Sequence, residues 1–199
     1  MTRRVFFAGE GPDELGNWAG HEAYHPTSDD SRTGGVLHAF VRRYLPFETV
    51  AAQSWKAIRK YKAGDHAKAE ERTVMGLALR ADELECDLLV FVRDRDGDRE
   101  RERDVERGIE RASKRFSVRI VGGTANEELE AWILAILGTP RSEALTDAKA
   151  KLTEIHGVET REQMCEIVAN AKLDGLPDGC VSLERWLARF EAALATGSP

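Results

Sequence analysis

Residues 87–93 read Asp-Leu-Leu-Val-Phe-Val-Arg, and this run decides the fold. Its apolar residues follow one another without a break, which is typical of a strand covered on both faces in a parallel sheet. Shorter β-prone runs lie at residues 4–9, 47–53 and 117–121. Apolar residues with helical spacing lie between them, at residues 36–45, 65–85, 100–115 and 126–137. This alternation predicts an α/β fold with a parallel sheet of about four strands flanked by helices.

The last third of the chain has a different pattern. After Gly138-Thr139-Pro140 the strand signals cease, and helical segments follow at about 143–155, 160–172 and 182–195. We therefore predict an α/β domain over residues 1–138 and a C-terminal α-helical extension over residues 139–199, packed on that domain.

Charge is distributed unevenly along the chain. The 29 basic and 35 acidic residues give a net charge of −6, which argues against a generic nucleic-acid coat protein. All of the acidic excess lies in residues 120–199, whereas residues 32–62 are strongly basic. Aromatic residues are interleaved with these cations, as in proteins that bind a phosphate backbone. The candidate nucleic-acid-binding residues are Arg42, Arg43, Lys56, Arg59, Lys60 and Lys62. The alternative is a solvated helix face.

Several protein classes are excluded by what the sequence lacks. No apolar run approaches the roughly 18–20 residues of a membrane span, and the Met1-Thr-Arg-Arg start is not that of a signal peptide. We therefore expect a cytoplasmic protein. Cys86, Cys165 and Cys180 are odd in number and far apart, which favours reduced thiols over disulfides or a zinc ribbon.

Carboxylates follow two of the predicted strands. Glu10 ends the first strand, and Asp94, Asp96 and Asp98 follow the third. The carboxyl ends of parallel strands line the binding crevice of an α/β sheet, so these side chains are expected to converge. Carboxylate oxygens suit Mg²⁺, which keeps waters that a phosphodiester oxygen can replace. The alternative is a polar turn, because Asp and Gly are favoured turn residues.

The order of these motifs resembles the TOPRIM domain shared by topoisomerases, primases and overcoming-lysogenization-defect nucleases. The resemblance rests on a strand ending in Glu-Gly (residues 5–11) and a later strand ending in Asp-x-Asp (residues 88–96). Residues 10–16, 35–43 and 127–132 are similar to a small group of TOPRIM-like prokaryotic proteins associated with anti-phage defence. The resemblance covers about residues 4–137.

This resemblance implies a Mg²⁺-dependent enzyme, with Mn²⁺ as a substitute, that cleaves phosphodiesters of DNA or RNA in prokaryotic defence. It implies a catalytic or metal-polarising role for Glu10 and Mg²⁺ binding by Asp94 and Asp96. Asp98 is a further candidate ligand. Glu14, a second candidate catalytic residue, and one of Glu128 or Glu130 complete the pocket or support a second metal, with Glu130 as the candidate ligand. Acidic residues in a first helical turn are also favoured by the helix dipole alone. A non-catalytic subunit that binds a partner protein through the acidic helical tail is the alternative.

A third reading comes from residues 21–25, His-Glu-Ala-Tyr-His, which match the HExxH pattern of zinc hydrolases. That pattern needs both His side chains on one helix, but Gly20 precedes it and Pro26 follows it. A third ligand at the usual spacing falls on Ser31, which cannot serve. We therefore rank a zinc site at His21 and His25 last.

Overall fold

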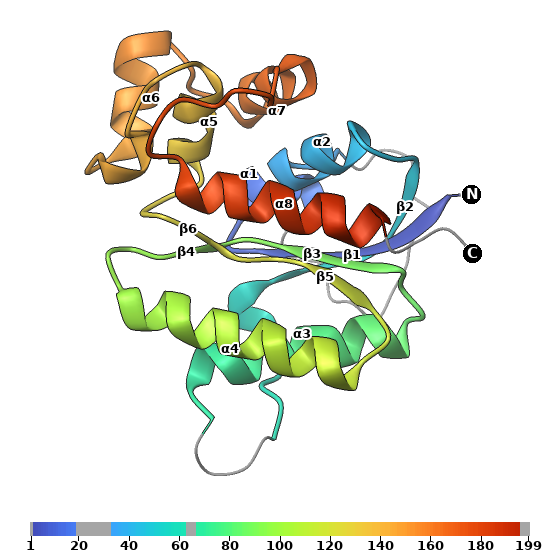
Figure 1. The fold of residues 1–199 in the computed structure, drawn as a ribbon. Helices are drawn as coiled ribbons and strands as arrows, with labels where there is room; N and C mark the ends of the chain where they lie inside the picture. The colour runs from blue at the N-terminus through green and yellow to red at the C-terminus, as the bar shows by residue number, and fades with distance from the viewer. Residues whose placement is uncertain (1, 19–32, 63–66, 196–199) are drawn as a thin grey trace.

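The computed structural model describes residues 2–18, 33–62 and 67–195 and confirms the predicted α/β fold. The central sheet has four parallel strands in the order β2-β1-β3-β5 (Figure 1). These strands are β1 (Arg3–Gly9), β2 (Phe47–Ser54), β3 (Leu88–Phe91) and β5 (Arg119–Val121). Beyond β3 and β5 the two segments that continue these strands pair again, as β4 (Arg93–Asp94) and β6 (Thr124–Ala125). The expected strand at 87–93 is therefore interrupted at Val92.

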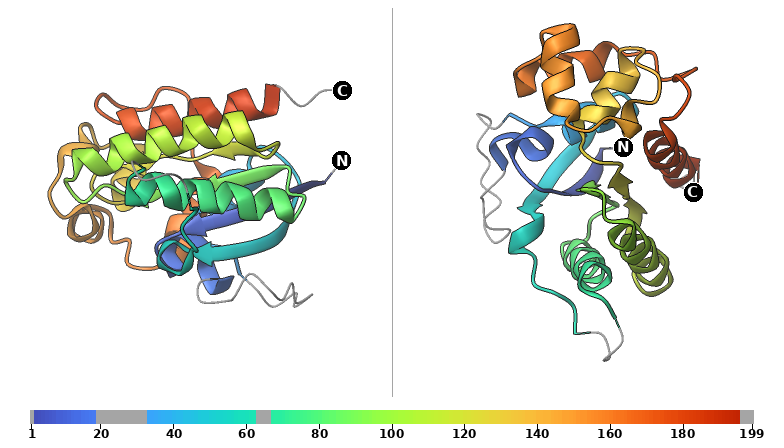
Figure 2. Two further views of the ribbon diagram at one scale, coloured as in Figure 1. Left: turned by 90° about the horizontal axis from the view of Figure 1, so that it is seen from below. Right: turned by 90° about the vertical axis from the view of Figure 1, so that its left-hand side faces the viewer.

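Helices cover both faces of this sheet, as the right-hand view of Figure 2 shows. One layer consists of α3 (Ala69–Glu83) and α4 (Arg99–Arg115). The other contains α2 (Val36–Arg42) and α8 (Val181–Ala195), with α5 (Glu130–Ile136), α6 (Ala148–His156) and α7 (Arg161–Asn170) beside them. Successive strand residues point to opposite faces. Phe6 and Leu89 accordingly join the core under α3 and α4, while Phe7 and Val90 join the core of the opposite layer.

The last helix, α8, lies directly on the sheet and shares its core. Trp186 is 1% exposed, and its indole N–H donates to the carbonyl of Phe91 in β3 at 3.1 Å. Arg119 of β5 donates to the carbonyl of Ala193 at 2.7 Å. The N-terminus of α8 is held by buried Glu143, which accepts from the backbone N–H of Ser182 at 3.0 Å. The helical extension thus supplies part of one face of the α/β core.

Three local differences from the sequence-based expectations have physical causes. The loop expected after the first strand contains a short helix, α1 (Pro12–Leu15), which begins with Pro at its first position. The helix expected over 126–137 is shorter, because residues 124–125 pair as β6 and Glu127 has φ 62°. The helix expected at 143–155 starts at Ala148, because Asp147 adopts a left-handed conformation and caps it.

Two further predictions concern the chain as a whole. All three cysteines are free thiols, with Cys86 and Cys180 buried. No helix in the described part of the chain is long and apolar enough to cross a membrane.

Candidate functional site

The predicted carboxylates lie at the carboxyl edge of the sheet, where the chain order reverses. From β1 the chain passes to β2 on one side and later to β3 on the other, so the ends of β1 and β3 flank the switch point where α/β proteins bind ligands. The right-hand view of Figure 2 looks at this edge. Glu10 follows β1, and Asp94 lies in β4, directly beyond β3.

Glu10 and Asp94 are neighbours, but the Glu10 side chain already has a partner. Its Oε1 accepts from the backbone N–H of Asp94 at 3.1 Å and forms an ion pair with the guanidinium of Arg93. Arg93 also pairs with Glu70 of α3, at 3.3 Å. Because the Glu10 carboxylate is held by Arg93 and by the Asp94 N–H, Glu10 in this arrangement orders the end of the strand, and acting as a base requires Arg93 to move away.

Two buried carboxylates, Glu14 of α1 and Glu130 of α5, accompany Asp94. They are 5% and 7% exposed. Gly9 allows Glu14 to pack against the end of β1, because a Cβ at position 9 would lie 2.6 Å from the Cβ of Glu14. The chain can therefore fold back after β1 and bring α1 against the strand end. Burial raises the pKa of Glu14 to about 7, although the Gly11 N–H donates to its Oε2 at 2.8 Å and opposes that shift.

Asp94 is the most perturbed member of this group. Its Oδ1 is buried and has no hydrogen-bond partner among the described residues. Burial raises the pKa of Asp94 to about 8, and the negative charges of Glu14, Glu130 and Asp96 add to the effect. We call Glu14, Asp94 and Glu130 the buried carboxylate cluster. A cation placed among them would relieve both the repulsion and the missing partner of Oδ1.

The side chains of Asp96 and Asp98 have other partners. Asp96 has φ 49° in the turn after β4, and its carboxylate pairs with Arg101 of α4 at 2.5 Å. Asp98 is the N-cap of α4, and its Oδ1 accepts from the backbone N–H of Glu100 at 2.9 Å and of Arg101 at 3.2 Å. Of the three aspartates of this loop, therefore, Asp94 is the one that belongs to the buried carboxylate cluster.

The capping role of Asp98 gives a testable expectation. Asp98→Ala removes the acceptor for two N–H groups and should lower the free energy of unfolding by about 1 kcal/mol, whereas Asp98→Asn should retain the cap. Urea denaturation followed by circular dichroism measures both changes. If Asp98→Asn abolished magnesium binding while leaving stability unchanged, Asp98 would be a ligand and not only a cap.

Sequence reasoning missed the cations of the site. Arg101 donates to the carbonyl of Asp94 at 2.8 Å and so holds the loop after β4. Lys149 of α6 reaches Asp13 at 3.2 Å and Glu130 at 3.3 Å, and the hydrogen bond to Asp13 raises its pKa. Arg93 and Arg101 lie next to the acidic motif in the sequence, so a role for them beside it could have been predicted. Nothing in the sequence links Lys149, in the helical extension, to residues more than a hundred positions earlier.

The predicted metal ligands do not form one compact set. Within residues 2–18, 33–62 and 67–195, no three acidic, His or Cys side chains are arranged to hold a metal ion. The donor chemistry nevertheless fits Mg²⁺, because the cluster offers hard carboxylate oxygens and the buried, unpartnered Oδ1 of Asp94. Asp94 is the residue that would hold the ion, and Glu14 and Glu130, whose charges act on Asp94, would have to move to become further ligands. The zinc reading of residues 21–25 lies outside the described residues.

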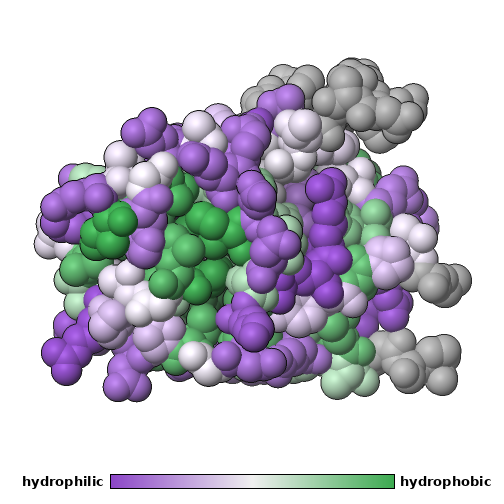
Figure 3. Space-filling model, turned by 90° about the horizontal axis from the view of Figure 1, so that it is seen from above, coloured by the Kyte–Doolittle hydropathy of each residue, from purple (hydrophilic) through white to green (hydrophobic). Residues whose placement is uncertain are grey.

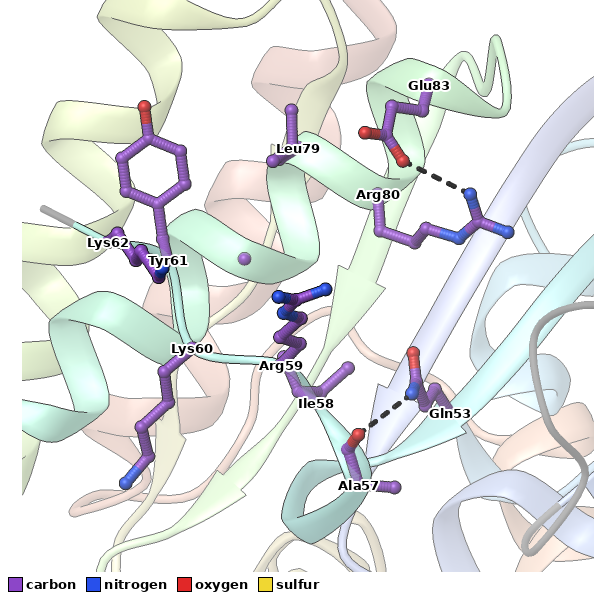
Figure 4. Close-up of a pocket in the computed structure, with 11 residues that line it drawn as sticks. Gln53, Ala57, Ile58, Arg59, Lys60, Tyr61, Lys62, Leu79, Arg80 and Glu83 are labelled. Atoms are coloured by element: carbon purple, nitrogen blue, oxygen red, sulfur yellow. Dashed lines mark hydrogen bonds and ion pairs between the residues drawn. The ribbon is translucent and has the colours of Figure 1, made fainter.

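The predicted cationic residues divide into two groups. The guanidinium of Arg43 donates to the carbonyls of Val168, Ala169 and Ala171 at 2.8, 2.7 and 2.6 Å and thereby caps the C-terminus of α7. Arg42 ends α2 in the layer that contains α8. Lys56, in contrast, follows β2 on the side of α3, and Arg59, Lys60 and Lys62 line a pocket there (Figure 4). The structure therefore places three of the six candidates, Arg59, Lys60 and Lys62, in one pocket.

Comparison of the chain with protein-family models, with curated proteins and with solved structures gives no match.

Proposed function

We propose that the protein is a cytoplasmic Mg²⁺-dependent enzyme that cleaves phosphodiesters of DNA or RNA, with Mn²⁺ able to replace Mg²⁺. The observation that carries the proposal is the buried Oδ1 of Asp94, which has no hydrogen-bond partner among the described residues and lies at the switch point of the sheet, where the charges of Glu14 and Glu130 act on it. A magnesium ion bound there would polarise the scissile phosphate and neutralise its developing charge. A role in prokaryotic anti-phage defence is proposed from the sequence resemblance alone.

The chain's own residues support this chemistry through their placement. Arg101 and the backbone pairing of β4 with β6 hold Asp94 at the sheet edge. Glu10 lies one hydrogen bond away and can accept a proton once Arg93 turns to a substrate phosphate. Lys149 supplies a positive charge at the rim, on the side of Glu130.

The test is a cleavage assay on labelled single-stranded and duplex DNA and RNA with Mg²⁺, Mn²⁺ or EDTA. We expect Glu10→Gln to lower the cleavage rate by roughly 10²–10⁴-fold, because it removes the base while keeping the hydrogen bond to Asp94 N–H. Glu127→Gln is the matched control, since Glu127 pairs with Arg95 and lies outside the cluster. Equal rates for the wild type and Glu10→Gln would contradict the role of Glu10.

A second candidate function is a non-catalytic subunit that binds a partner protein. It is favoured by hydrophobic residues that gather on the face at the top of Figure 1, which Figure 3 shows from above. A groove of about 430 Å³ on α6 and α7 is lined by Leu137, Val158 and Ile167 among polar side chains. Nearby in the chain, Ile155 is 54% exposed. Absence of both metal-dependent cleavage and Mg²⁺ binding in calorimetry would favour this candidate over the enzyme.

A further inference from the structure

A pocket of about 610 Å³ lies between the segment that follows β2 and helix α3. In Figure 4 the guanidinium of Arg59 points into the space between this segment and the helix, and the ring of Tyr61 stands at its side. One part of this ring packs against Phe116, at 6.3 Å between centroids, and the guanidinium of Arg115 lies 5.4 Å from its centroid. Gln53, Lys60, Leu79 and Arg80 are also among the residues that line it. The pocket therefore combines cationic, amide and apolar groups with one carboxylate, Glu83, which is paired with Arg80.

The cations of this pocket differ in pairing from those elsewhere on the same layer. No carboxylate of the described residues pairs with Arg59, Lys60 or Lys62, although Arg80 pairs with Glu83 at 3.1 Å. On α4, by contrast, three cations have carboxylate partners within a turn, as in Lys114 with Glu110 at 2.6 Å. Positive charge at the pocket is thus available to an anionic ligand.

The pocket wall is anchored to the helix before any ligand arrives. The backbone N–H of Tyr61 donates to the carbonyl of Arg72 at 3.0 Å, and the side chain of Arg72 donates back to the Tyr61 carbonyl at 3.0 Å. Gly76 of α3 allows this approach, because a Cβ there would lie 2.4 Å from the Arg59 carbonyl. A pre-organised wall loses less conformational entropy when a ligand binds.

The segment that lines the pocket begins at the carboxyl edge of the sheet. Ser54, the last residue of β2, places its hydroxyl 3.4 Å from the carbonyl of Glu10. The next residue, Trp55, donates to Glu70 at 2.8 Å, and the guanidinium of Arg93 lies 5.8 Å from its ring centroid. The segment that lines the pocket therefore starts beside Glu10 and leads away from the buried carboxylate cluster.

We propose that this pocket binds one single strand of nucleic acid, which extends from the buried carboxylate cluster. Arg59 and Lys60 contact its phosphates, and a base lies against Tyr61. The inference rests on the proposed function and names its substrate class. A pocket of this volume is on the scale of a small ligand, roughly 300–1,000 Å³, and cannot enclose both strands of a duplex. Cations with an aromatic side chain are the usual means of binding a single strand without sequence preference.

The test measures binding in EDTA, where no cleavage occurs, by fluorescence anisotropy with a 12-nucleotide single strand and the corresponding duplex. We expect the single strand to bind more tightly. The double variant Arg59→Gln, Lys60→Gln should weaken single-strand binding about tenfold or more and reduce the slope of log affinity against log salt by about 1.4, or about 0.7 for each lost phosphate contact. Tyr61→Ala should weaken binding about tenfold. Arg103→Gln with Lys172→Gln, both exposed, is the matched control and should change neither quantity.

Three results would overturn the inference. They are tighter binding of the duplex, unchanged single-strand binding by the double variant, and displacement of the strand by adenosine monophosphate at the same nucleotide concentration, which would indicate a mononucleotide site. The two proposals fail separately. Cleavage without pocket-dependent binding refutes only the pocket, and pocket-dependent binding without metal-dependent cleavage refutes only the proposed enzyme.

Discussion

Replacing Asp94 by asparagine is expected to abolish magnesium-dependent cleavage and, without metal, to make the protein more stable at alkaline pH. The loss of cleavage should be roughly 10²–10³-fold, because the variant loses the anionic ligand at the centre of the buried carboxylate cluster. The gain in stability has the same origin. Asp94 has a buried oxygen that no group in the described part of the chain contacts by a hydrogen bond, and it is repelled by Glu14 and Glu130; the amide removes that repulsion.

The pH dependence follows from the sign of the pKa shifts. Folding raises the pKa of Asp94 from 3.8 to about 8 and that of Glu14 from 4.5 to about 7. Between these values the folded protein holds protons that the unfolded chain has released, so stability falls as pH rises from about 4 to 8. Asp94→Asn should flatten this fall and gain roughly 2 kcal/mol at pH 8, since one pKa unit corresponds to about 1.4 kcal/mol and the charges are coupled.

Magnesium should reverse this trend in the wild type. Its ligands must be deprotonated, so the stabilisation by Mg²⁺ should grow with pH and reach about 2.7 kcal/mol at a hundred times the dissociation constant. Thermal unfolding between pH 5 and 9, with and without Mg²⁺, measures both effects. Asp174→Asn, in the exposed loop before α8, is the control and should behave as the wild type. An Asp94→Asn variant that still gains stability from Mg²⁺ would show that the ion binds elsewhere.

Trp186→Ala should cause the largest loss of stability, about 3–5 kcal/mol in the free energy of unfolding. The side chain is 1% exposed, and its ring centroid lies 5.3–5.7 Å from those of Phe40, Phe190 and Trp132. The substitution leaves a cavity between α8, α2 and α5 and leaves the carbonyl of Phe91 without its indole donor. For a chain of this length the melting temperature should fall by roughly 10 °C.

The same variant tests how α8 belongs to the fold. If α8 is part of the sheet's core, the variant should unfold in one transition, measured by circular dichroism so that the lost tryptophan does not affect the signal. Trp186→Phe should cost less, and Val181→Ala, at a position 52% exposed on the same helix, should change stability by less than 0.5 kcal/mol, about the limit for surface sites. An early, separate loss of helix signal would instead indicate that α8 folds apart from the sheet.

Much of the candidate site follows from strand order, and the rest depends on side-chain partners. Glu10 and Asp94 were expected together because each follows a strand of the same parallel sheet, and the structure makes them neighbours. The sequence could not indicate that Arg93 would form an ion pair with Glu10, or that the side chain of Asp98 would cap the N-terminus of α4. Both outcomes depend on where a flexible side chain finds its best partner, which periodicity does not encode.

The sequence by itself determined the layered architecture. Uninterrupted apolar runs such as residues 88–92 can be satisfied only when both faces of a strand are covered, and apolar positions with helical spacing supply the covering helices. Tertiary structure alone decided that α8 lies on the sheet and that the charges of the buried Glu14 and Glu130 act on Asp94. The reason is physical: local patterns record which residues avoid water, but burial of like charges arises only when distant segments pack against one another.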